Sequence, residues 1–70
     1  MCTIKVKEKN ILTSLRIRKG LSMNELAKKA DLNVAVISRI ENELSIPRPK
    51  TALKICDALG VGFDEIFEIS

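Results

Sequence analysis

Side chains suited to metal binding or catalysis are scarce in this chain of 70 residues. Histidine is absent, and the two cysteines, Cys2 and Cys56, lie far apart in no Cys-x-x-Cys or Cys/His cluster. We therefore expect no metal site, no disulfide and no bound cofactor, and we interpret Cys56 as a small core residue. No nucleophile with a base, and no pair of carboxylates, has a spacing that indicates catalysis, so we do not expect an enzyme.

Basic side chains are the binding groups that this sequence supplies most clearly. The net charge is +3, but it is unevenly distributed along the chain. Residues 1–54 hold all twelve Lys and Arg and five acids, a balance of +7, whereas residues 55–70 hold four acids and no base, a balance of −4. This distribution fits either an ordinary solvated surface or a basic face that contacts phosphates.

The capping pattern around Ser22 predicts a helix from about Met23 to Lys29 or Ala30. Ser22 and Glu25 have the spacing of a capping box. Leu21 and Leu26 have the spacing of the apolar staple that accompanies such a box. Ala27 then falls on the inner face, where two helices that cross closely leave no space for a larger side chain.

A second helix is predicted over residues 34–42, after a turn of three or four residues. Asn33 is a favourable N-cap, and the helix that follows buries Ile37 and Ile40. Asp31 stands where the turn favours a left-handed residue, a conformation that Asp tolerates better than most. Two helices this close indicate a helix-turn-helix, whose second helix is presented to the DNA major groove.

The rest of the chain predicts a single all-α domain of five helices over residues 1–70. The first helix runs over about 11–19, from an Asn10 cap to Gly20, and the fourth over about 49–59, from Pro49 to Gly60. The fourth is expected to pack four side chains inward: Leu53, Ile55, Cys56 and Leu59. Residues 63–69 are expected to form a short C-terminal helix.

Residues 1–9 are an N-terminal arm, for which an extended segment, an edge strand and a lead-in to the first helix all remain open. No stretch is apolar enough for a signal peptide or a membrane span. We therefore expect a cytoplasmic protein without a membrane partner.

The ordered motifs resemble the Xre-type helix-turn-helix family, to which the phage lambda and 434 repressors of the Cro/C1 type belong. The motifs extend from Leu12 to Phe67 and comprise LRIRKGLS, NELAKKADL, ISRIEN, Pro47, ALKICDALGV and DEIF. The resemblance implies a lambda-repressor-like fold and a transcriptional regulator that binds double-stranded DNA. It further implies a repressor that binds a near-palindromic operator as a homodimer.

The resemblance also assigns structural roles by position. Arg16 and Glu41 match a charged pair that links the first and third helices beneath the DNA-facing surface. Asn42 matches a position that contacts the DNA backbone, although an Asn there also caps a helix C-terminus well. Glu43 follows where the family usually has Gly, so we expect a strained or differently shaped helix exit.

Base readout is expected from the third helix, from Asn33, Val34, Ala35, Ser38 and Arg39. Arg39 is the best candidate because arginine can bind guanine O6 and N7 together, although a phosphate contact or a solvated charge is an equal alternative. Val34 and Ala35 are suited to thymine methyl groups, or alternatively form an apolar patch for a protein partner.

Phosphate contacts are expected from the positions around that helix: Met23, Lys28, Asn42, Arg48 and Lys50. Met23 replaces the Gln that is common in the family, so only the backbone N–H groups of the helix start would act there. For Lys28, Arg48 and Lys50, a plain surface charge is as good an interpretation as a phosphate contact.

The C-terminal residues are more apolar than one small core requires. We expect Phe63 and Ile66 to close the core, and Phe67 and Ile69 to be free to contact a second subunit, with a monomer as the alternative. The alternative function is a protein-interaction module of the same fold, such as an antitoxin or an anti-repressor.

Overall fold

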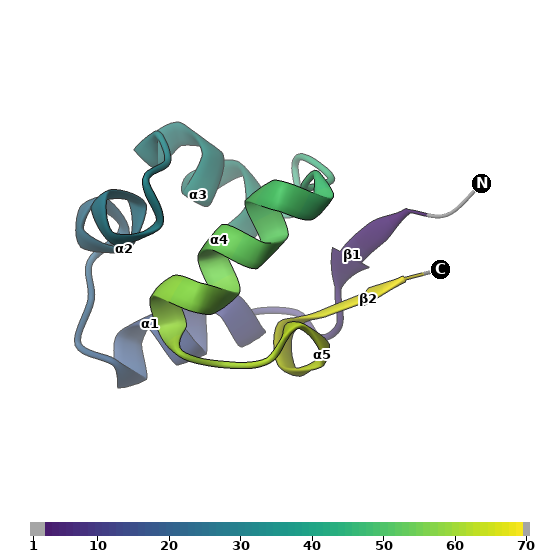
Figure 1. Cartoon of the computed structure of the whole chain (residues 1–70), viewed down its shortest axis with the longest axis horizontal. Helices are drawn as coiled ribbons and strands as arrows, with labels where there is room; N and C mark the ends of the chain where they lie inside the picture. Colours follow the sequence, from purple (N-terminus) through teal and green to yellow (C-terminus); the bar gives the residue numbers. More distant parts are fainter. Residues whose placement is uncertain (1–2, 70) are drawn as a thin grey trace.

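The structure, a computed structural model, describes residues 3–69, and these form five helices and two short strands (Figure 1). The elements in chain order are β1 (Ile4–Val6), α1 (Ile11–Arg18), α2 (Met23–Ala30), α3 (Val34–Glu41), α4 (Pro49–Leu59), α5 (Phe63–Ile66) and β2 (Phe67–Ile69). The predicted five-helix fold is confirmed, with a small sheet in addition to it. The expectation for Cys2 lies outside the described residues.

Helices α1 to α4 all end in the same way, with a left-handed residue that turns the chain back. These residues are Gly20, Asp31, Glu43 and Gly60, with φ between 57° and 72°. In each case the next N–H donates to a carbonyl five residues earlier, which closes the last turn. The four bonds are Leu21 to Arg16 (3.0 Å), Leu32 to Ala27 (2.8 Å), Leu44 to Arg39 (2.8 Å) and Val61 to Cys56 (3.1 Å).

Asn10 is the N-cap residue of α1, as predicted, but its side chain makes no capping hydrogen bond. Its backbone is left-handed, with φ at 66°. Asn is favoured both at N-caps and in left-handed turns, and the turn before α1 uses the second property. The helix also ends at Arg18, one residue earlier than expected.

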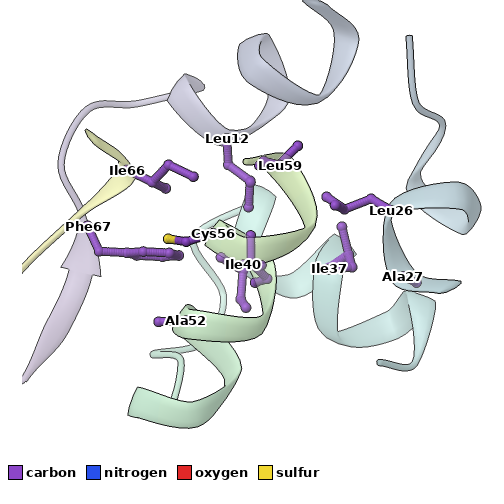
Figure 2. Packing of buried hydrophobic residues seen from close by; sticks show 11 residues of the cluster. Leu12, Leu26, Ala27, Ile37, Ile40, Ala52, Cys56, Leu59, Ile66 and Phe67 are labelled. Carbon is purple, nitrogen blue, oxygen red and sulfur yellow. The ribbon is translucent and has the colours of Figure 1, made fainter. Parts of the chain in front are cut away.

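The core gathers around α4, which packs against α2 and lies among the other helices (Figure 2). Its inward residues are Ala52, Ile55, Cys56 and Leu59, which follow the spacing of one helix face. The prediction that Leu53 packs inward is wrong, because this side chain is 53% exposed. The smaller Ala52 is buried on the inner face of α4 instead of Leu53.

The two strands join the ends of the described chain in an antiparallel pair. Ile4 lies opposite Ile69 and Val6 opposite Phe67, which settles the open choice for the N-terminal arm in favour of a strand. The predicted helix over residues 63–69 therefore ends at Ile66. Phe67 is 0% exposed and belongs to the core, so the expectation that its side chain is free for a second subunit is wrong.

Candidate nucleic-acid interface

Helix α2 begins at a complete capping box. Ser22 Oγ accepts a hydrogen bond from the Glu25 N–H (3.1 Å), and the Glu25 carboxylate accepts one from the Ser22 N–H (2.9 Å). The hydrogen bond from the Ser22 backbone, and then that from its side chain, lowers the pKa of Glu25 from its ordinary value of 4.5. The predicted start of this helix is therefore confirmed.

The turn between α2 and α3 has the predicted chemistry. Asp31 adopts the left-handed conformation, with φ at 57° and ψ at 47°. Asn33 then caps α3, because its side-chain oxygen accepts a hydrogen bond from the Ala35 N–H (2.9 Å). Ala27 is buried on the face of α2 that packs against the core. These local contacts hold α2 and α3 as a helix-turn-helix.

Helix α3 buries one face and leaves another open to solvent. Ile37 and Ile40 lie in the core, whereas Ala35 and Arg39 are exposed and Val34 is 37% exposed. Ser38 is half-buried beside them. The residues proposed for base readout thus share the accessible side of α3, apart from Asn33, whose side-chain oxygen is engaged in the cap.

An ion pair joins α3 to α1 beneath this open face. The Arg16 guanidinium donates to both oxygens of Glu41, at 2.7 Å from Nε and 3.3 Å from Nη2. The two side chains are only 11% and 3% exposed. The structure therefore contains the pair that the resemblance implies, in a partly desolvated setting where a charged partner matters most.

Two further contacts complete this pair and were missed in the sequence. Thr13 Oγ1 donates to Glu41 at 2.7 Å, and Arg16 Nη1 donates to the Leu21 carbonyl at 2.8 Å. Thr13 stands three residues before Arg16, on the same face of α1, and this spacing is the only signal that indicated it. Arg16 thus connects α1, α3 and the segment that leads into α2.

The exit of α3 combines a side-chain cap with backbone strain. Asn42 Nδ2 donates to the Ser38 carbonyl at 2.8 Å, so the capping role considered for this residue is present. Glu43 follows with φ at 58°, where a residue with a Cβ is less favourable than glycine. The exit keeps the usual left-handed shape and does so with an unfavourable residue.

The candidate phosphate-binding residues lie on α2, at the exit of α3 and at the start of α4. Lys28, Arg48 and Lys50 are exposed, with Arg48 immediately before the first turn of α4. The Met23 side chain packs against the core instead, so only the backbone at the start of α2 is accessible there. The exposure of these positions allows phosphate contacts.

Cys56 is buried in the core of the described part of the chain. Burial, with smaller effects from Asp57 and Glu65, raises the pKa of the Cys56 thiol. Among residues 3–69 there is no group of three His, Cys, Asp or Glu that could hold a metal ion. Within the same range no helix has the length and apolar character to cross a membrane.

The domain is of the helix-turn-helix class. It has a capped α2, a tight turn and an exposed α3 that an ion pair connects to α1. The sequence profile of the Xre-like helix-turn-helix family matches residues 12–66, so the chain belongs to this family. The chain is also similar to the HTH-type transcriptional repressor RghR of Bacillus subtilis (strain 168), with 37% identity over 54 residues. That match covers 76% of this chain and only 40% of RghR, so the chain spans less than half of its relative.

Proposed function

We propose that this protein is a sequence-specific DNA-binding transcriptional regulator that acts as a repressor. The observation that carries the proposal is the geometry of α3, whose outer face is open while its inner face is fixed by the Arg16–Glu41 pair. Membership of the helix-turn-helix family supports DNA binding, and the similarity to a transcriptional repressor supports repression.

Base readout in this proposal depends mainly on Arg39. Its exposed guanidinium is suited to guanine O6 and N7, a contact that is worth about 1–3 kcal/mol of discrimination. Val34 and Ala35 lie nearer the start of α3 and have no polar side-chain atoms, so they suit thymine methyl groups. The expected half-site therefore combines a guanine with neighbouring A·T pairs.

Phosphate contacts supply most of the affinity in this proposal. Lys28, Arg48 and Lys50 lie on elements that flank α3, and the backbone N–H groups at the start of α2 add a neutral donor site. Asn42 Nδ2 donates to the Ser38 carbonyl at 2.8 Å, and its second N–H has only a long contact with Ser38 Oγ at 3.4 Å, so the exposed amide retains a donor for phosphate. In this proposal Asn42 therefore both caps the exit of α3 and contacts the DNA backbone.

The regulator is proposed to act as a homodimer on a near-palindromic operator. A twofold dimer presents two α3 helices to major-groove segments about 34 Å apart, one turn of DNA. Ile69 remains exposed at the end of β2 and keeps its proposed place in the contact, whereas the buried Phe67 does not.

Selection of binding sites from random DNA at two salt concentrations tests this function. We expect an enriched, near-palindromic sequence, with weaker binding at the higher salt concentration. The Arg39→Ala variant should lose preference at one base pair of each half-site and keep its non-specific affinity. Failure to enrich any sequence, together with salt-independent binding, would overturn the proposal.

A second candidate function is a protein-interaction module, such as an antitoxin or an anti-repressor. The apolar Val34 and Ala35 at the open start of α3 are the observation that favours it, because such residues also suit a protein surface. A stable complex with a co-purified protein that forms through α3, combined with absence of DNA binding, would favour this alternative.

A further inference from the structure

An exposed apolar surface lies between the sheet and the loop that follows α3. Leu44 and Ile46 in the loop are 76% and 65% exposed, and Ile69 at the end of β2 is 65% exposed. A groove connects the loop to the strands, and its lining residues are Thr3, Ile4, Ile46, Pro47, Arg48, Pro49 and Ile69. We call the surface formed by Leu44, Ile46 and Ile69 the loop patch. It holds three of the six large hydrophobic residues that are exposed in the described chain.

The loop patch is fixed rigidly to α3. The Leu44 N–H donates to the Arg39 carbonyl at 2.8 Å, and the Glu43 N–H donates to the Ile40 carbonyl at 3.1 Å. At the far end of the loop, Pro47 is buried against the body of the domain. A partner seated on the loop patch is therefore held at a defined orientation to the open face of α3.

Charges of opposite sign stand at the two ends of the loop. Glu43 and Arg48 are both exposed, and the uncharged residues 44–47 lie between them. When two copies of such a segment meet across a twofold axis near Ile46, Glu43 of each copy lies towards Arg48 of the other. The loop is thus complementary to itself in charge as well as being apolar at its centre.

Direct pairing of strand edges between two copies is less favourable than packing of the loops. The described strands have Lys5 at the centre of β1 and Glu68 at the centre of β2. A twofold pairing of β1 with its copy sets Lys5 against Lys5, and a pairing of β2 sets Glu68 against Glu68. Like charges that lie directly opposite each other destabilise a strand pair. The apolar loop patch avoids this repulsion.

We propose that a second copy of this chain covers the loop patch, with Leu44 and Ile46 at the centre of the contact and Glu43–Arg48 pairs at its rim. The proposal rests on the homodimer of the proposed function and assigns the surface that forms it. Leu44 and Ile46 expose apolar area that a second copy would remove from water, and a few desolvated residues at the centre of an interface carry most of its binding energy.

The main test compares two equally exposed isoleucines. The Ile46→Lys variant should raise the dimer dissociation constant by about tenfold or more in sedimentation experiments without DNA. The Ile17→Lys variant, at a side chain that is 62% exposed on α1, should leave it unchanged. Circular dichroism of both variants checks that they fold. Unchanged dimerisation of folded Ile46→Lys, equal loss in both variants, or a wild-type protein that remains monomeric at tens of micromolar would overturn the proposal.

A charge-reversal series tests the geometry of the contact independently. Glu43→Arg and Arg48→Glu should each weaken dimerisation, because each sets like charges together across the axis. The double variant should recover most of the wild-type affinity, whereas additive losses would contradict the twofold arrangement. These measurements omit DNA, since Arg48 is also a proposed phosphate contact.

Binding to a DNA fragment with a single half-site separates this proposal from the proposed function. Ile46→Lys should bind the half-site with wild-type affinity and lose only the extra affinity for the complete operator. If the wild-type protein binds no DNA, the proposed function fails, while sedimentation of the variants still decides whether the loop patch forms a dimer.

Discussion

At the scale of single residues, the start of α2 depends on reciprocal bonds between Ser22 and Glu25. The lowered pKa of Glu25 means that its charged form is favoured in the folded protein. This contribution to stability is therefore present at pH values above the ordinary carboxyl pKa of 4.5, and it is lost as the pH falls through the folded value.

We expect the Ser22→Ala variant to return the pKa of Glu25 towards its ordinary value, because both the side-chain bond and the ordered backbone donor are weakened. NMR titration of the Glu25 carboxyl carbon in the variant and in the wild-type protein measures the change. A pKa of Glu25 that stays equally low in Ser22→Ala would contradict this expectation and assign the shift to the Ser22 backbone N–H alone.

We predict that replacement of Glu43 by glycine makes the domain more stable, because it relieves backbone strain. Its left-handed backbone, with φ at 58°, is disfavoured for a side chain that has a Cβ. We expect Glu43→Gly to raise the free energy of unfolding by about 1 kcal/mol, measured by urea denaturation. Glu43→Ala is the matched control, since it removes the same charge and keeps the Cβ; an equal gain in both variants would assign the effect to charge.

At the scale of elements, local sequence signals predicted well where helices begin, and predicted less well which face of a helix is buried. The starts of α2 and α3 were correct because Ser22 and Asn33 act on backbone groups two or three residues away. Leu53 was placed wrongly because a helical spacing does not by itself decide which of two adjacent faces is buried. The choice was made by packing with α2 and α5, and this information lies elsewhere in the chain.

The C-terminal strand shows even more clearly that local sequence does not reveal which distant residues an element will contact. Phe67 ends up paired with Val6, a residue at the opposite end of the chain, and no local pattern around FEIS reports this contact. The candidate site was predictable in its scaffold because the family motifs specify Arg16, Glu41 and the caps. Thr13 and the Leu21 carbonyl were not predicted, because they join the ion pair through tertiary geometry.

At this scale we predict how much stability the domain loses when the ion pair between α1 and α3 is broken. Either Arg16→Ala or Glu41→Ala leaves a partly buried charge without its partner, so each should cost about 3 kcal/mol or more of stability. The double variant removes both charges and should cost clearly less than the sum of the single losses, as measured by urea denaturation.

Glu41→Gln is the matched control for this cycle. It retains an oxygen that can accept from Thr13 while it removes the charge, so it should be less harmful than Glu41→Ala. Additive losses in the double variant would mean that the two residues contribute independently and that the pair does not orient α3.

At the scale of the whole molecule, the charge distribution separates two ends of the domain. The base-free stretch, as far as the structure describes it (residues 55–69), forms the later part of α4, α5 and β2, away from α3 at the top of Figure 1. The acidic segment therefore lies where it repels DNA least when α3 faces the duplex. In the proposed complex, the exposed Lys28, Arg48 and Lys50 act together on the phosphate backbone.

Neutralising these three bases provides a test of the whole binding surface. Each phosphate contact releases counterions, which contributes about 0.9 to the slope of log affinity against log salt concentration. A variant with Lys28, Arg48 and Lys50 all changed to Gln should therefore lose up to about 2.7 from that slope per subunit, equally for specific and random DNA. A control with Lys9, Arg18 and Lys19 changed to Gln has the same net charge, and these residues flank or end α1, below α3 in Figure 1. Equal loss of slope in both variants would show that total charge, rather than the surface around α3, attracts DNA.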